Sequence, residues 1–166
     1  SGATVPLIRS SKLNKSTVEL MRFCKSEHIP LMLFIVNYEA MWREPLGAEL
    51  LRHQWDLIVN DESHRLKSPG GKASRFAARL RQRAKKVVLL SGTMLPHSPL
   101  DAYGVYRAMD PTIFGTSFTR FRARYAVVNP LYPSQVRSWI NQDEMKRKLV
   151  ACTHTVKKDE VLDLPD

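Results

Sequence analysis

The chain has 166 residues, a hydrophobic fraction of 43% and a formal net charge of +10. This length and apolar content suit one globular domain and argue against a disordered chain. No apolar run approaches the roughly 20 residues of a membrane helix, and no secretory signal is visible, so we expect a cytoplasmic protein with no membrane partner. Cys24 and Cys152 lie far apart without metal-ligand spacing. We interpret them as reduced thiols.

The first half of the chain alternates predicted helices with short apolar strands. Alternation of this kind is typical of an α/β fold, in which helices flank a sheet of parallel strands. The helix predicted over 73–86 is strongly amphipathic, because its apolar residues recur at helical spacing. In chain order the predicted elements are a helix over 17–26, a strand over 31–37, an interrupted helix over 39–53, a strand over 57–60, a helix over 73–86 and a strand over 87–90.

After residue 95 the pattern becomes mainly helical and rich in aromatic residues. We expect residues 96–166 to form a helical extension that packs on the sheet or projects from it, and the whole chain to be one domain. The predicted elements are helices over 99–109, 117–125, 141–151 and 156–162, with a proline-containing loop over 127–134.

Positive charge is concentrated between the second and third predicted strands, in a stretch without a single acid. Such a surface attracts polyanions, nucleic acid first among them. Charge alone leaves a solvated helix face equally open. The basic residues of the stretch are Arg65, Lys67, Lys72, Arg75, Arg79, Arg81, Arg83, Lys85 and Lys86.

The strongest chemical signal is the run Asp61-Glu62-Ser63-His64, directly after the strand over 57–60. Ligands of open α/β sheets bind at the carboxyl ends of the strands. An acid there can hold Mg²⁺, usually through water, and a neighbouring glutamate can orient and deprotonate an attacking water. The alternative is a turn whose acids only cap the next helix.

A second signal follows the next predicted strand. Ser91-Gly92-Thr93 begins where the strand over 87–90 ends. The carboxyl ends of parallel strands meet at the same edge of a sheet, so we expect these hydroxyl groups to lie close to the acidic run. Gly92 would permit a close approach of the backbone.

Together these runs resemble the Swi/Snf type of superfamily 2 helicases and ATPases. Residues 55–68 (WDLIVNDESHRLKS) resemble the DEAH-type acidic motif, and residues 89–94 (LLSGTM) resemble the Ser/Thr-Gly-Thr motif, with Met94 in place of the usual proline. Residues 36–40, 99–125 and 156–165 resemble further family segments, although His154 and Thr155 replace an arginine pair. The details look most like the phage and bacterial members.

The resemblance implies that the chain is a large part of the N-terminal RecA-like lobe of such a motor. It implies Mg²⁺ and ATP as cofactors of the complete enzyme and double-stranded DNA as its partner. Glu62 would be the catalytic base and Asp61 the acid associated with Mg²⁺ through water. Coupling of the nucleotide site to lobe movement would involve Ser63, His64, Ser91, Gly92 and Thr93. The expected nucleic-acid contacts are Asn37, Tyr38, Arg65, Lys67, Lys72, Arg75, Arg79 and Arg83.

A phosphate-binding loop of the form G-x-x-x-x-G-K-[ST] is absent from the 166 residues. Residues 69–74 (PGGKAS) follow the acidic run instead of preceding it. We therefore expect this chain alone to bind no ATP tightly and to be inactive without the rest of the helicase core. We also expect the strand over 87–90 to leave an exposed edge that permits self-association, with residues 4–8 filling part of the gap at best.

Three functions remain open from the sequence. The first is a part of a DNA-translocating ATPase, and the second is a non-catalytic nucleic-acid-binding or assembly module that has lost the ATP site. The third is a hydrolase that uses Ser91, His64 and Asp61. A hydrolase is disfavoured because the chain has no G-x-S-x-G elbow.

Overall fold

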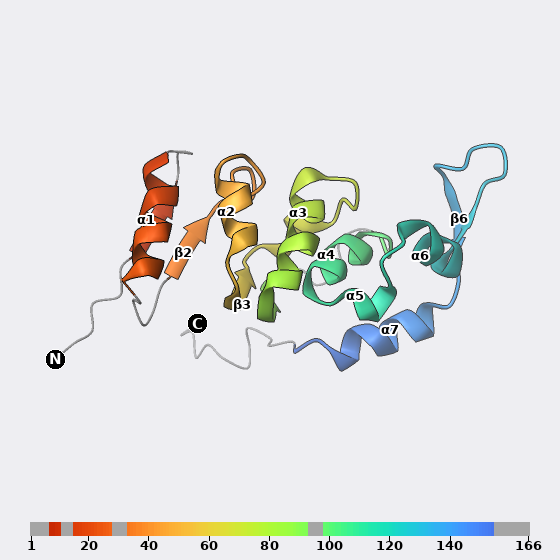
Figure 1. Cartoon of the computed structure of the whole chain (residues 1–166). Helices are drawn as coiled ribbons and strands as arrows, with labels where there is room; N and C mark the ends of the chain where they lie inside the picture. The colour runs from red at the N-terminus through yellow and green to blue at the C-terminus, as the bar shows by residue number, and fades with distance from the viewer. Residues whose placement is uncertain (1–6, 11–14, 28–32, 93–97, 155–166) are drawn as a thin grey trace, which may run out of the picture. The chain divides into compact units, whose positions relative to one another are not determined.

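The computed structural model describes residues 7–10, 15–27, 33–92 and 98–154 (Figure 1). The chain divides into two compact units, Ser1–Phe118 and Thr119–Asp166. Within the described ranges, no helix is both long enough and apolar enough to cross a membrane. The predicted short helix over 156–162 lies outside the described residues.

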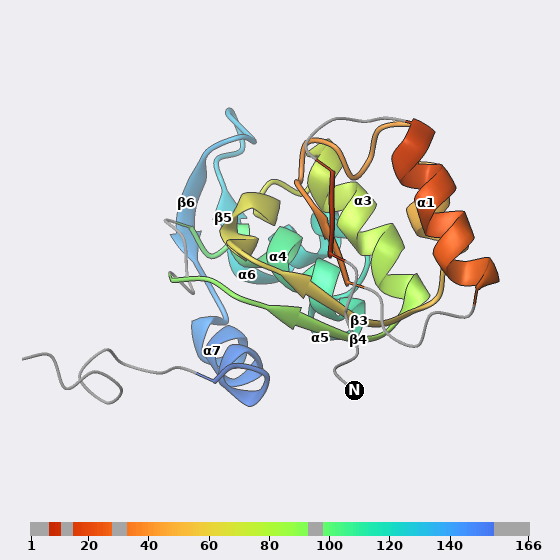
Figure 2. The ribbon, with the colours of Figure 1, turned by 90° about the vertical axis from the view of Figure 1, so that its left-hand side faces the viewer.

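The first unit alternates strands and helices, and the predicted α/β class with parallel strands and a mainly helical C-terminal third is confirmed. Figure 2 shows its strands β3 and β4 side by side with α3 along one side of them. Its elements are β1 (Leu7–Ser10), α1 (Lys15–Ser26), β2 (Leu33–Val36), α2 (Leu46–Arg52), β3 (Trp55–Asn60), η1 (Ser63–Leu66), α3 (Lys72–Leu80), η2 (Arg81–Arg83), β4 (Ala84–Leu89), α4 (Asp101–Met109) and α5 (Pro111–Phe114), where η marks a short 3₁₀ helix.

Two parallel strand pairs form in this unit. β1 pairs with β2, starting at Leu7 opposite Leu33, and β3 pairs with β4, from Trp55 opposite Ala84 to Asn60 opposite Leu89. The N-terminal segment was expected to fill a gap beside β4 at best, and this expectation is wrong for its described part, which pairs with β2. Residues 4–6 lie outside the described residues.

Helices α1, α2, α3 and α4 bury apolar side chains in a common core with η1. The apolar stripe predicted for the basic helix is confirmed for Phe76, Ala77 and Leu80 of α3, which are buried, and is wrong for Ala84, which begins β4. The Phe34 and Trp55 rings meet edge to face with their centroids 5.6 Å apart, so the inner sides of β2 and β3 share this core. The opposite side of β3 and β4 is exposed, and it carries the apolar side chains of Leu57, Val59, Val88 and Leu90.

The helix predicted over 73–86 is too long. α3 ends at Leu80, η2 follows, and Ala84 already pairs with Trp55 of β3. Helix propensity is a weak preference, and the backbone hydrogen bonds of a strand pair override it here. As a consequence, Arg83 belongs to η2 and does not continue the helical stripe of Arg75 and Arg79.

The second unit contains α6 (Phe118–Tyr125), whose first residue lies at the boundary, β5 (Ala126–Val128), β6 (Val136–Trp139) and α7 (Gln142–Ala151). β5 and β6 form an antiparallel pair, so the predicted loop over 127–134 is wrong at its start and is the connection of a hairpin. Glu144 of α7 accepts hydrogen bonds from Arg124 and Tyr125. These bonds lower the pKa of Glu144 to about 2.

The boundary between the units lies later than the change of character after residue 95. α4 belongs to the first unit, because it packs closely on the segment that follows the acidic run. A side chain at Gly104 would place its Cβ 2.3 Å from the carbonyl oxygen of Leu66 and 2.6 Å from that of Lys67. Arg107 donates from Nη2 to the carbonyl oxygen of Pro69 at 3.0 Å. The assignment of the whole chain to one lobe stays a prediction.

Gly104→Ala should therefore destabilise the chain by about 1–3 kcal/mol or more, since backbone atoms must move to admit the methyl group. Urea unfolding followed by tryptophan fluorescence measures this change. Gly70→Ala is the matched control, because its Cβ would meet nothing within 4 Å. Equal stability of the two variants would contradict the close packing of α4 on η1.

Candidate functional site

The acidic run is held in place by the neighbouring strand. Beyond Asn60, whose carbonyl oxygen accepts from the Leu90 amide at 2.9 Å, the Ser63 amide donates to the Leu90 carbonyl oxygen at 2.9 Å. These bonds extend the pairing of β3 with β4 past the end of both strands. The acidic turn and the Ser91-Gly92 segment therefore lie at the same end of the strand pair.

The backbone of the turn is unusual at Glu62. Its φ of 46° and ψ of 48° lie in the left-handed region, which costs a residue with a Cβ about 1–2 kcal/mol. The Asp61 carboxylate offsets part of this cost, because its Oδ1 accepts from the Glu62 amide at 2.9 Å. The Glu62 side chain is exposed, and its Oε2 lies 3.1 Å from Nδ1 of His64. Residues held in strained conformations concentrate at functional sites.

Tyr38 joins the turn after β2 to the acidic run. Its hydroxyl group donates to the Asp61 carbonyl oxygen at 2.7 Å. Burial, with a smaller contribution from the Asp61 carboxylate, raises the pKa of Tyr38 to about 12, although Arg65 opposes the shift. The Arg65 guanidinium lies 5.7 Å from the centroid of the Tyr38 ring and forms an ion pair with Glu39. Both predicted nucleic-acid contacts, Tyr38 and Arg65, are thus engaged within the protein.

The second strand end is described only in part. Ser91 is half-buried and Gly92 is exposed, whereas Thr93 and Met94 lie outside the described residues. A Cβ at Gly92 would meet nothing within 4 Å. The close backbone approach expected at Gly92 is therefore not made to any described neighbour.

The predicted nucleic-acid contacts fall into two groups. Asn37 has a structural task, because its Oδ1 accepts from the Ala40 amide at 2.7 Å, while Tyr38 and Arg65 hold each other and the acidic turn. The second group has exposed side chains that form no ion pair within the described part of the chain. It consists of Lys67, Lys72, Arg75, Arg79 and Arg83.

Three residues of the surroundings were not singled out from the sequence. Trp42 lies beneath the Lys72 ammonium group, which is 4.5 Å from the ring centroid, and the Arg43 guanidinium is 5.2 Å from it. Arg107 fixes the segment before α3 through the carbonyl oxygen of Pro69, and the first turn of α3 through the hydroxyl group of Ser74. No spacing rule reveals the contacts of Lys72 with Trp42 and of Arg107 with Pro69 and Ser74, because these residues lie far apart in the chain.

The donors present fit a magnesium ion that keeps most of its water. Among the described residues, no group of three or more His, Cys, Asp and Glu side chains could enclose a metal ion. Mg²⁺ is commonly held through one or two carboxylates together with substrate phosphates. The exposed Asp61 carboxylate is suited to that limited task.

Tyr38→Phe should lower the free energy of unfolding by about 0.5–1.5 kcal/mol, because the Asp61 carbonyl oxygen loses a hydrogen-bond donor. A pKa raised in the folded state means that this stabilisation is fully present below about pH 10 and is lost as the pH rises towards 12. Urea unfolding of both proteins across this pH range measures the difference. A difference that grows above pH 10 would contradict the assignment.

No protein-family model matches the chain. It is 34% identical over 93 residues to the "SWI/SNF-related matrix-associated actin-dependent regulator of chromatin subfamily A-like protein 1" of Drosophila melanogaster, which covers 56% of the chain and 12% of that protein. It is 32% identical over 114 residues to the Caenorhabditis elegans homologue of that protein. This match covers 68% of the chain and 15% of the homologue.

A third relative is the "DNA annealing helicase and endonuclease ZRANB3" of Bos taurus, 30% identical over 96 residues, or 58% of the chain and 9% of that protein. The solved SWI2/SNF2 ATPase core of Sulfolobus solfataricus in complex with dsDNA has a TM-score of 0.40 at 22% identity, covering 72% of the chain and 27% of that structure. The chain thus spans between 9% and 15% of the curated relatives, which are animal proteins and give no support to a phage or bacterial likeness. The relatives of this chain are SWI/SNF-related proteins and a DNA annealing helicase.

Proposed function

We propose that the chain is part of the motor core of an ATP-dependent DNA translocase of the Swi/Snf type. The observation that carries this proposal is the acidic turn at the end of β3, bonded to the end of β4 through the Ser63 amide. Two exposed carboxylates, Asp61 and Glu62, lie there at the carboxyl end of parallel strands, where α/β proteins bind their ligands. The SWI/SNF-related relatives support the same function.

In this proposal the two carboxylates have different tasks. Asp61 helps to hold Mg²⁺ through water, and the ion, when bound, neutralises charge on the phosphates. Glu62 orients the attacking water and accepts its proton. Ser63, His64, Ser91, Gly92 and Thr93 couple this site to movement between lobes, for which the Ser63–Leu90 bond offers a direct path between the two strand ends.

The DNA-facing surface is formed by the exposed basic residues that follow the acidic turn. Arg75 and Arg79 share one side of α3, and Arg83 follows in η2. Like charges one helical turn apart repel each other by a few tenths of a kcal/mol, so a polyanion would stabilise them. Lys67 and Lys72 add to the same positive segment. Arg65, Asn37 and Tyr38 are further nucleic-acid contacts in this proposal, each also held by a contact within the protein.

The finer parts of the resemblance belong to this proposal as well. They are the DEAH-type identity of the acidic run, the N-terminal RecA-like lobe, ATP as the nucleotide and the likeness to phage and bacterial members. The partner that completes the site would supply a phosphate-binding loop and a second lobe. The strand pair also leaves β4 with one edge unpaired among the described strands, so self-association through that edge is part of the proposal.

A second candidate is a non-catalytic DNA-binding or assembly module. One observation favours it, since the 166 residues contain no G-x-x-x-x-G-K-[ST] loop to hold a nucleotide. The basic surface would serve both candidates equally. They differ in whether the acidic turn contributes to catalysis in the complete protein.

Glu62→Gln in the complete protein should leave ATP binding largely intact and reduce turnover by roughly 10²-fold or more, as expected when a general base is lost. DNA-stimulated phosphate release and nucleotide affinity are the two measurements. Glu44→Gln is the control, because Glu44 is an exposed carboxylate outside the acidic turn. Normal turnover of the Glu62 variant would favour the non-catalytic module.

Reversal of Arg75, Arg79 and Arg83 to glutamate should weaken duplex binding by the 166-residue chain and flatten its dependence on salt. Each phosphate contact contributes about 0.9 to the slope of log affinity against log salt, so the slope should fall by up to about 3. Fluorescence anisotropy at several salt concentrations measures it. Reversal of Lys25, Lys146 and Arg147, which are exposed on α1 and α7, is the charge-matched control. An unchanged slope in the first variant would assign the α3 side to solvent or to another protein.

A further inference from the structure

Two positively charged side chains from different parts of the chain lie over the ring of Trp42. Arg43 is its neighbour in the turn before α2, whereas Lys72 begins α3. The Lys72 ammonium nitrogen lies 4.5 Å from the ring centroid and the Arg43 guanidinium carbon 5.2 Å from it. Both distances are within the range of attraction between a cation and an aromatic ring. We call Trp42, Arg43 and Lys72 the tryptophan cluster.

The cluster has a fixed base. The Trp42 side chain is half-buried and packs against the hydrophobic core of the first unit. Its backbone is also confined, because a Cβ at Gly47 would lie 3.1 Å from the Trp42 carbonyl carbon. The Gly47 amide in turn donates to the carbonyl oxygen of Arg43 at 2.8 Å.

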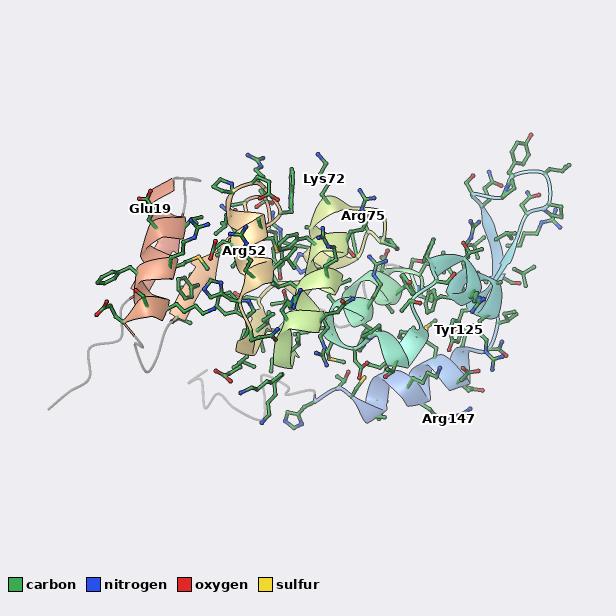
Figure 3. All side chains as sticks on the ribbon, viewed as in Figure 1. Glu19, Arg52, Lys72, Arg75, Tyr125 and Arg147 are labelled. Carbon is green, nitrogen blue, oxygen red and sulfur yellow. The ribbon has the colours of Figure 1, made fainter. Side chains whose placement is uncertain are left out.

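Lys72 is positioned from the other side by α4. Arg107 donates to the Pro69 carbonyl oxygen at 3.0 Å and to the Ser74 hydroxyl group at 3.2 Å, and so holds the residues before and after Lys72. Ser74 itself is buried. The start of α3 is therefore anchored, although the Lys72 side chain projects into solvent, as does that of Arg75 one turn later (Figure 3).

The two cations of the cluster, unlike four others of the first unit, have no carboxylate partner among the described residues. Arg22 and Arg52 pair with Glu49, Arg65 with Glu39 and Lys85 with Asp56. Across the described residues, Arg43 and Lys72 form no ion pair. The nearest acid in sequence to Arg43 is Glu44, whose Oε2 accepts from the Ala48 amide at 3.2 Å. An aromatic ring orients a cation without occupying its N–H donors.

We propose that Arg43 and Lys72, held over Trp42, bind phosphate groups of a DNA duplex, with Trp42 as the positioning residue. This inference rests on the proposed function and extends the DNA-facing surface from α3 to the turn before α2. Arg43 presents several donors in a rigid plane, whereas Lys72 is a compact charge. Both suit phosphate oxygens, which are the main protein contacts of a DNA duplex. Because ring contacts already restrict both side chains, less conformational freedom is lost when a phosphate binds.

The test compares Arg43→Ala/Lys72→Ala with the control Lys146→Ala/Arg147→Ala, which removes the same charge from the exposed side of α7. Anisotropy with a fluorescent DNA duplex is measured from low to high salt on the 166-residue chain. The cluster variant should bind more weakly, and its salt slope should fall by about 2, which corresponds to two lost phosphate contacts. Equal slopes in wild type and cluster variant, or an equal loss in the control, would overturn the proposal.

Trp42 is tested separately, since a positioning role predicts a graded effect. Trp42→Phe keeps an aromatic ring and should retain most of the affinity, whereas Trp42→Leu should lose more although all charges remain. Thermal unfolding of both variants shows whether they are equally folded. Where Trp42→Leu does not fold, duplex-dependent quenching of Trp42 fluorescence replaces it, measured in a Trp55→Phe/Trp139→Phe background in which Trp42 is the one remaining tryptophan. Absence of quenching, or equal affinity of two folded variants, would remove Trp42 from the proposal.

Failure of this inference can be distinguished from failure of the proposed function. If charge reversal on α3 flattens the salt slope while the cluster variant does not, DNA binding stands and the tryptophan cluster is excluded. If neither variant changes the slope, both proposals fail. If the cluster variant instead loses binding to poly-glutamate and keeps its affinity for DNA, the surface belongs to an acidic protein partner.

Discussion

Parallel pairing between β3 and β4 holds the candidate site together, because it continues beyond both strands. The Leu90 backbone accepts from Ser63 and donates to Asn60, so each strand end fixes the other. Without these two bonds, nothing in the pairing would oblige Glu62 to keep its left-handed conformation beside Asp61. The position of both carboxylates thus depends on a strand whose own sequence contains no acid.

The same strand pair separates two kinds of surface. One side of the strand pair packs on α3. The acidic run begins where β3 ends, and the basic segment continues from it through α3 and η2. The other side leaves Leu57, Val59, Val88 and Leu90 exposed. The cations near the site have two kinds of partner. Arg65 forms an ion pair with Glu39, whereas Lys72 lies over the aromatic ring of Trp42. A cation on a ring keeps its donors available, which is why the surface beside Trp42 can receive an anion.

Sequence patterns were sufficient for features that depend on local periodicity. The buried stripe of α3 and the strand over 57–60 follow from the spacing of apolar residues. The end of α3 could not be predicted, because residues 81–86 have acceptable helix propensity and only pairing with β3 draws them into a strand. The hairpin was missed for a similar reason, since prolines in its connection obscured two short flanking strands.

Within the candidate site, the adjacent acids and the Ser91-Gly92 segment could be placed at neighbouring strand ends from sequence alone. The tasks of individual side chains could not, since they depend on contacts across the fold. Asn37 and Tyr38 make backbone contacts that stabilise turns, which the sequence did not indicate, and their contact with nucleic acid stays a prediction. The role of Trp42 could not be predicted from the sequence, because a lone aromatic residue beside a helix is most often part of the core.

The central claim is that the acidic turn acts on a nucleotide held by other parts of a motor protein. Phosphate release from Mg-ATP, with and without duplex DNA, tests it most directly when the 166-residue chain and the complete protein are compared. We predict DNA-stimulated release by the complete protein and only background release by the chain, which lacks the loop that holds the phosphates. DNA-stimulated release by the chain alone, or none by the complete protein, would contradict the account.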